Sequence, residues 1–197
     1  MGRVGSDQQR GSVVSELHTS TASSGDEQVR WRLADPSDMP FVYRLVTQVD
    51  PRWYRFSRHG LEPSGMLGLM ASIAGGAIVH DWLGEPVACA LLADSSESGT
   101  GHLEYYALPT AHAEHCAALA APDLLGALFS ASSPRRLYVE RFENDPHILG
   151  EAEHLFTTEV VLPRFMLIDG TYEDRTTLVL TADDWWAWHD ARTEDAP

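Results

Sequence analysis

Side chains alternate between two faces along residues 101–108, which is typical of a β-strand with one buried face. One face would carry Leu103, Tyr105 and Ala107. The other face would carry Glu104 together with His102, Tyr106 and Leu108. A carboxylate beside aromatic surface is suited to accept a proton as a general base. We therefore expect this strand to be central to the fold, with Glu104 as the candidate base.

Short apolar or alternating runs predict the remaining strands. They are residues 29–33, 77–82, 87–92, 136–142, 160–168 and 176–181. Residues 83–86 contain Gly84 and Pro86, and a second turn is expected at Asp169 and Gly170. These turn residues predict two hairpins, the second of which would close the domain.

Helix signals separate these strands. Asp35 before Pro36 is typical of a helix start, because an Asp side chain caps free amides and proline fits the first turn. A second helix is expected from Pro63 to a stop at Gly75 and Gly76. Further helices are expected at residues 118–130, 147–156 and 182–189.

This order of elements predicts one α/β (α+β) domain at residues 28–189. Residues 1–27 are rich in Gly, Ser and Thr without periodicity, and we expect them to form a disordered leader. Residues 190–197 are expected to form a flexible tail.

The formal net charge is −15, with 29 acidic and 14 basic side chains. Such a balance argues against a nucleic-acid partner, because phosphate binding needs a basic surface. It fits a cationic partner such as an amine, or it serves solubility alone. No apolar run approaches the roughly 20 residues that span a bilayer, and the first residues lack a signal core, so we expect a cytoplasmic protein without a membrane partner.

The closing hairpin carries a family resemblance. Its turn, Asp169, Gly170, Tyr172 and Asp174, resembles the Asp-Gly-x-Tyr-x-Asp turn of ribosomal-protein-alanine acetyltransferases and related members of the GNAT (Gcn5-related N-acetyltransferase) superfamily. In those proteins an apolar strand follows and often ends at an acidic residue and Trp, as at Trp185. The order of strands and helices is also similar to the GNAT layout, which implies a mixed, mostly antiparallel central sheet flanked by helices. The resemblance covers roughly residues 29–185.

The resemblance implies an acyltransferase that moves an acyl group from acetyl-CoA or another acyl-CoA to an amine of a small molecule or a peptide N-terminus. It places the acyl-CoA in a splay between residues 101–108 and residues 136–142. The implied catalytic carboxylates are Glu104 and, on the adjacent strand, Glu140. The implied cofactor-binding positions are Tyr105, Tyr106, Ala107, Leu108 and Asn144. For Asn144, a plain helix cap before Pro146 is an equal alternative.

The sequence departs from the family where the pyrophosphate-binding loop should follow the central strand. Residues 109–120 contain no Gly and no Arg, and Glu114 adds repulsion toward phosphate. Three interpretations stay open: weakened acyl-CoA binding, an acyl carrier protein as donor, or an accessory protein without acyl transfer. Residues 147–156 also lack the Tyr that often serves as general acid in the family.

Other candidate residues have competing interpretations. Arg52, Trp53, Arg55 and Arg58 could form an acceptor-site wall for a carboxylate or phosphate, or a solvated loop with one aromatic anchor. Three tryptophans near the C-terminus would seal an edge of the sheet or form a homodimer patch: Trp185, Trp186 and Trp188. Two histidines and a cysteine lie close together in the sequence: His112, His115 and Cys116. No further ligand group follows at a spacing typical of zinc sites, so we expect no metal site there.

Overall fold

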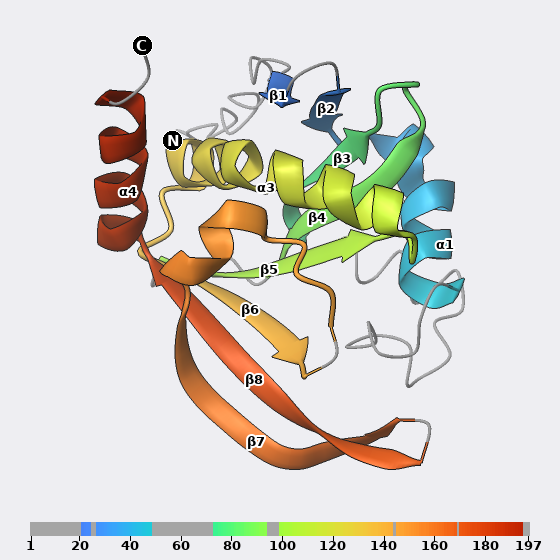
Figure 1. Cartoon of the computed structure of the whole chain (residues 1–197), viewed down its shortest axis with the longest axis vertical. Coiled ribbons are helices and arrows are strands. Elements are labelled where there is room, and N and C mark those ends of the chain that lie inside the picture. Colours follow the sequence, from blue (N-terminus) through green and yellow to red (C-terminus); the bar gives the residue numbers. More distant parts are fainter. Residues whose placement is uncertain are drawn as a thin grey trace, which may run out of the picture.

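The computed structural model describes residues 21–24, 27–48, 73–93, 99–143, 145–168 and 170–194. They form a single eight-stranded sheet in the order β1-β2-β3-β4-β5-β6-β8-β7, with helices on both faces (Figure 1). The strands are β1 (Thr21–Ser24), β2 (Glu27–Leu33), β3 (Ile73–His80), β4 (Pro86–Ala93), β5 (Thr100–Ala107), β6 (Arg136–Phe142), β7 (Thr157–Ile168) and β8 (Thr171–Thr181). Only β5 and β6 pair in parallel, so the sheet is mixed and mostly antiparallel, as predicted.

Two long helices cover opposite faces of the sheet. α1 (Met39–Gln48) buries Val42, Leu45 and Val46 against Ile78, Cys89, Leu91 and Tyr106. α3 (Ala111–Ser132) packs on the other face, which includes Leu103 and Tyr105. Because side chains alternate along a strand, β5 presents its odd-numbered residues to α3 and its even-numbered residues to α1. The predicted alternation of this strand is confirmed.

Shorter elements complete the domain. The 3₁₀ turns η1 (Pro36–Asp38) and η4 (Gly150–Leu155) precede α1 and β7, and α4 (Ala182–Glu194) stands beside the end of α3 (Figure 1). Gly150 has a φ of 57°, and a Cβ there would overlap the carbonyl oxygen of Ala118, so only glycine lets η4 approach α3 this closely. No helix within the described ranges is long and apolar enough to cross a bilayer.

Several boundaries differ from the sequence predictions. α3 begins at Ala111 and not near residue 118, because the Thr110 side chain caps the Ala113 amide, and Pro122 lies inside the helix. The pair Gly75 and Gly76 does not end a helix but lies within β3, beside a register shift. The rest of the helix predicted from Pro63 lies outside the described residues.

The domain limits also differ in detail. Residues 21–24, inside the predicted leader, form β1 and pair with β2. Residues 190–194, inside the predicted tail, extend α4. The predicted helix over residues 147–156 is reduced to η4.

The predicted helix start at Asp35 is confirmed, and an arginine from β2 also binds its capping residues. The Asp35 side chain accepts from the Ser37 amide, and the Asp38 side chain accepts from the Asp35 amide, which is a capping box. Arg32 on β2 donates to both carboxylate oxygens of Asp38 at 2.7 and 2.6 Å. This charged hydrogen bond from Arg32 lowers the pKa of Asp38 below its usual value.

Asp38→Asn should flatten the loss of stability in acid. Because the folded-state pKa of Asp38 lies below the unfolded value, its contribution is full above about pH 4 and is lost as pH falls through the folded pKa. At pH 7 the variant should have a lower melting temperature than wild type. Between pH 7 and pH 3 its melting temperature should then fall by less than that of wild type. Arg32→Gln removes the other partner and should flatten the profile likewise. Melting profiles as steep as wild type in both variants would refute this role.

Candidate active site

The two central strands separate after a short stretch of pairing. β5 and β6 pair only at Thr100 with Arg136, Gly101 with Leu137 and His102 with Tyr138. β5 continues to Ala107 and β6 continues to Phe142 without further pairing among the described residues. The predicted splay between these strands is therefore present, and it opens toward the carboxyl end of both (Figure 1).

The separation leaves hydrogen-bonding backbone groups along one edge of β5. The Leu108 amide donates to the Val87 carbonyl at 2.9 Å, so the β4-facing backbone groups belong to the even-numbered residues of this strand. By alternation, the backbone groups of Tyr105 and Ala107 point into the gap toward β6, beyond the last pair of His102 with Tyr138. A gap lined by free backbone amides and carbonyls can bind an extended amide-containing chain by strand-like hydrogen bonds. Of the predicted cofactor-binding positions, Tyr105 and Ala107 have this orientation, whereas the Leu108 amide is already used.

Glu104 stands on the α1 face of β5 at this gap. It is half-buried, and the Tyr106 hydroxyl donates to its Oε2 at 2.6 Å. Tyr106 itself is buried against α1, so its ring is fixed and the hydrogen bond orients the carboxylate. Together with burial, the negative charge of Glu104 raises the pKa of the Cys89 thiol on β4, which keeps that thiol protonated. The structure thus places the predicted base, oriented by a neighbouring hydroxyl, beside the splay.

Glu140 lies across the gap on the same face but has a cationic partner. Arg175 on β8 approaches Glu140 Oε1 at 3.3 Å, and its guanidinium stacks over the Phe165 ring at 4.2 Å. Both partners of this ion pair are largely buried. This ion pair fixes the Glu140 carboxylate against β8 and suits it to a positioning role.

An aromatic pair closes the narrow end of the splay. The His102 ring on β5 stacks on the Tyr138 ring on β6, with centroids 5.3 Å apart and an interplanar angle of 26°. These residues form the last paired position before the strands separate. The stack therefore marks the closed end of the gap on the α1 face, and sequence reasoning missed it because the β5–β6 register is a long-range property.

The Tyr105 side chain is turned away from this face. It is buried against α3, its hydroxyl donates to the Ala117 carbonyl at 2.6 Å, and burial raises its pKa well above the usual value. Any contact of Tyr105 with an acyl donor would come from its backbone.

The start of α3 replaces the expected phosphate-binding loop. Only Pro109 and Thr110 separate Leu108 from the helix, so residues 111–120, expected as a loop, are helical. Thr110 accepts hydrogen bonds from the amides of Ala113 and Glu114, and the amides of Ala111 and His112 have no backbone or capping partner in the described part of the chain. Two amides at the positive end of a 22-residue helix can bind an anion, though fewer than a glycine-rich loop supplies.

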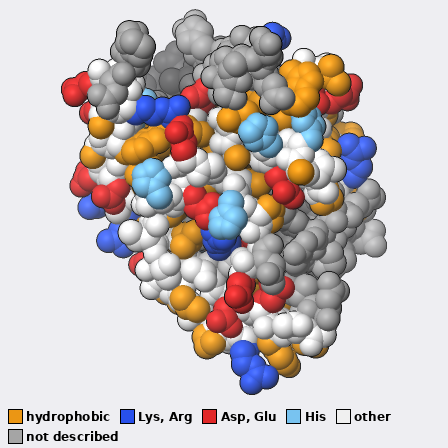
Figure 2. All heavy atoms as spheres, in the orientation of Figure 1, with side chains coloured by type: hydrophobic (Ala, Val, Ile, Leu, Met, Phe, Trp, Pro, Cys, Tyr) orange, Lys and Arg blue, Asp and Glu red, His pale blue; other side chains and the backbone are white. Residues whose placement is uncertain are grey.

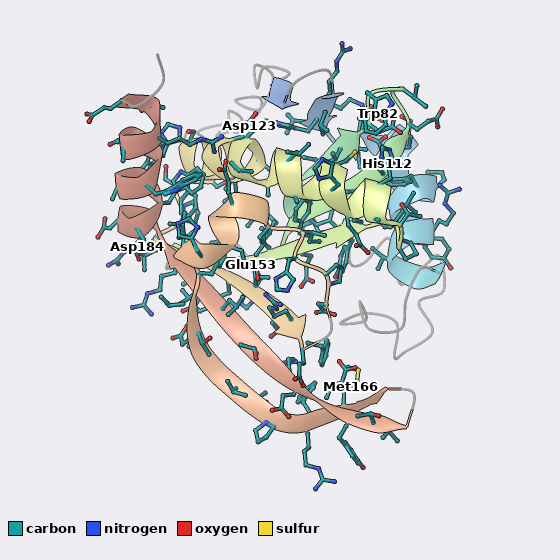
Figure 3. All side chains as sticks on the ribbon, viewed as in Figure 1. Trp82, His112, Asp123, Glu153, Met166 and Asp184 are labelled. Carbon is teal, nitrogen blue, oxygen red and sulfur yellow. The ribbon has the colours of Figure 1, made fainter. Side chains whose placement is uncertain are left out.

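His112, in the first turn of α3, is held by the β3–β4 hairpin. Its Nε2 lies 3.1 Å from Asp81 Oδ2, and its ring meets the Trp82 ring edge-on with centroids 4.2 Å apart (Figure 3). Burial alone would raise the pKa of Asp81, but hydrogen bonds from His112 and from the Glu85 and Leu83 amides hold it below its usual value. This cluster fixes the first turn of α3 against the sheet, and the sequence pattern did not reveal it.

Other predicted site residues lie outside the described residues. These are Asn144 and the proposed acceptor wall of Arg52, Trp53, Arg55 and Arg58. Their roles stay predictions.

Comparison with known proteins adds evidence for the fold. No family model matches the chain, and no curated protein matches it. Solved structures do match it. Spermidine N-acetyltransferase from Vibrio cholerae, in complex with CoA and spermine, aligns with a TM-score of 0.65 at 15% identity over 80% of this chain and 98% of that one. Mutant forms of the spermidine/spermine N-acetyltransferase of that organism align with a TM-score of 0.62 at 15% identity, over 82% and 99% of the two chains.

A protein assigned as a phosphinothricin N-acetyltransferase aligns with a TM-score of 0.59 at 15% identity, over 78% of this chain and 98% of that one. The fold is therefore of the GNAT type, as the closing hairpin and the order of elements predicted.

Proposed function

We propose that this protein is an N-acyltransferase that moves an acyl group from an acyl thioester, acyl-CoA, to an amine. The observation that carries the proposal is the splay of β5 and β6 with Glu104 at its edge. The free backbone edge at Tyr105 and Ala107 would hold the amide-containing arm of the donor. N-acetyltransferases with the same fold, one of them solved with CoA and spermine, support this interpretation.

The chemistry needs little beyond positioning and one proton acceptor. The amine nitrogen attacks the thioester carbonyl carbon, the carbon–sulfur bond breaks, and the thiolate leaves with the electron pair. Glu104 takes the proton that the amine loses, while Tyr106 keeps the carboxylate oriented. The described residues 145–156 hold no tyrosine to protonate the thiolate, so solvent would supply that proton.

The acceptor is proposed to be a small-molecule amine or a peptide N-terminus. Glu104 lies on the α1 face at the splay, and the chain carries a formal charge of −15. Negative potential over the acceptor side attracts cationic amines. The peptide N-terminus rests on the resemblance to the ribosomal-protein-alanine branch, and a cytoplasmic location and the exclusion of nucleic acid stay part of the proposal.

A second donor is favoured by the start of α3. The two-residue connection without glycine, followed by Glu114, offers little to a free pyrophosphate. An acyl carrier protein presents the same pantetheine arm without an exposed pyrophosphate. A carrier-protein donor is therefore the second candidate, and an accessory protein without acyl transfer is the third.

One assay distinguishes these functions. Release of free thiol would be measured with acetyl-CoA, octanoyl-CoA and an acetylated acyl carrier protein, each with spermidine, a monoamine and an alanine-initiated peptide. We expect amine-dependent thiol release with at least one CoA donor. Release from the carrier protein alone would select the second donor, and no release from any combination would reject acyl transfer.

Trp185, one of the three tryptophans expected to form a homodimer patch, is fully buried and cannot contact a second chain. We propose a homodimer contact at the β7–β8 hairpin instead. β7 is an edge strand, and the hairpin exposes Phe165, Leu167 and Tyr172. In Figure 2 the lower part of the molecule shows separate hydrophobic side chains among acidic and basic ones. Exposed apolar side chains on an edge strand favour pairing with another chain. Light scattering at micromolar concentration should give twice the chain mass, and a monomer mass would contradict this contact.

A further inference from the structure

A pocket of about 170 Å³ lies between the second half of α3 and the strands β2 to β5, on the face opposite Glu104 (Figure 1). Its floor comes from one face of each strand, because the lining residues of a strand are two positions apart, as are Ala90 and Leu92. Its roof comes from one face of α3, because lining residues there recur at spacings of three and four, as do Ala121, Leu124 and Leu128. The pocket is thus a slot between the sheet and the helix.

Small residues on both walls leave this slot unfilled. Protein interiors are close-packed and contain few voids larger than a water molecule, so a space of this size is uncommon. Three lining positions of the sheet and three of the helix carry no side chain or only a methyl group: Gly75, Ala77 and Ala90, and Ala121, Ala127 and Ala131. A Cβ added at Gly75 would meet no atom within 4 Å. The sequence therefore keeps room here for another molecule.

The walls offer a ligand almost no hydrogen bonds. The Tyr105 hydroxyl already donates to the Ala117 carbonyl at 2.6 Å, and the indole nitrogen of Trp31 is buried and adds almost no polar surface. Ser132 lies on the exposed rim, and none of the described lining residues is charged. Water would lack the two to four partners that it normally has in a protein, and a charged ligand would lose its hydration without replacement. The walls therefore favour an apolar occupant.

The pocket opens to solvent at the end of α3. Ala131 and Ser132, in the last turn of this helix, are exposed and belong to the lining. The lining residues of α3 begin at Ala121, about 16 Å along the helix from Thr110, by the usual rise per residue. The opening is thus separate from the start of α3, where the proposed acyl donor would lie.

We infer that this pocket binds a small uncharged hydrocarbon, a single ring or a short branched chain, held by apolar contacts alone. The size fits, because an apolar cavity of about 150 Å³ holds benzene. The chemistry fits, because ligand pockets bind apolar bodies through hydrophobic walls and use polar groups only where the ligand has polar atoms to pair. This site stands independently of the proposed acyl transfer.

A matched pair of probes tests the inference. Toluene and phenol have nearly the same size, but phenol carries a hydroxyl group that the pocket cannot pair. Binding of each to the full chain would be measured by isothermal titration calorimetry at several temperatures. We expect toluene to bind with a negative heat-capacity change, which marks the burial of apolar surface. Phenol should bind roughly ten- to a hundredfold more weakly, because its hydroxyl would be buried without a partner.

Two neighbouring positions of α3 provide the matched variants. Ala131 and Ser130 are both exposed, but only Ala131 lines the pocket. Ala131→Leu adds a larger side chain at the opening and should lose most of the toluene binding, whereas Ser130→Leu should bind toluene as wild type does. Ala90→Leu fills the pocket from the sheet side and should abolish binding. A cooperative melt of each variant would show that it folds.

Three results would overturn the inference. They are no binding of toluene to wild type, equal affinities for toluene and phenol, and equal toluene binding by Ala131→Leu and Ser130→Leu. If toluene does not bind and Ala131→Leu alone lowers the mass measured by light scattering, the pocket receives a second chain and not a small hydrocarbon.

Discussion

Glu104→Gln should lower turnover by roughly 10²–10⁴-fold, the usual contribution of a positioned general base. The amide has nearly the same shape as the carboxylate, so the Tyr106 hydroxyl can still donate to its oxygen and β5 should keep its structure. Because the change removes a proton acceptor and not a binding contact, kcat and kcat/KM should fall together. Steady-state kinetics with the best donor and amine pair would measure both parameters.

Glu140→Gln is the matched control. Its side chain lies on the same face of the adjacent strand but is paired with Arg175, so the loss of turnover should be much smaller. Equal losses in the two variants would mean that both carboxylates act as a pair. Unchanged turnover in Glu104→Gln, with the melting temperature preserved, would remove Glu104 from the mechanism.

Trp185→Ala should produce the largest loss of stability of any single change considered for this fold. Trp185 is fully buried and stacks on Phe129 with ring centroids 5.6 Å apart, which attaches α4 to α3. Truncating a buried tryptophan to alanine typically costs about 3–5 kcal/mol of unfolding free energy. For a domain of this size the melting temperature should fall by roughly 6–20 °C.

The adjacent residue supplies the control. Trp186 is 37% exposed, so Trp186→Ala should lower the unfolding free energy by much less than Trp185→Ala does. Trp185→Phe keeps a stacking ring and removes an indole nitrogen that has no partner among the described residues, and it should recover most of the stability. Calorimetric melts of the three variants decide the matter. Equal melting temperatures for Trp185→Ala and Trp186→Ala would refute the attachment.

The strands were the most predictable part of the fold. β6 has the predicted bounds, and the alternation in β5 assigned each side chain to its correct face. Period-two patterns are local, so a single sequence carries them. β1 was missed because its four small residues, three of them polar, have no such pattern and form a strand only by pairing with β2.

The helices and the site depended more on tertiary context. The helix predicted over residues 118–130 is present but begins earlier, because the Thr110 cap and an alanine-rich stretch extend α3 back to Ala111. Glu104 was found because it lies on a patterned strand. The pairs Glu140 with Arg175 and Asp81 with His112 could not be found, because each joins residues more than thirty positions apart, the first across the sheet and the second between a hairpin and α3.

The most direct test of the proposed function is a crystal structure with acetyl-CoA bound. We expect the pantetheine arm in the gap between β5 and β6, with hydrogen bonds to the backbone of Tyr105 and Ala107. The thioester should lie beside Glu104, with the pyrophosphate against the first amides of α3. Acetyl-CoA bound away from this gap, or a gap left empty at saturating acetyl-CoA, would contradict the assignment of the splay as the acyl-donor site.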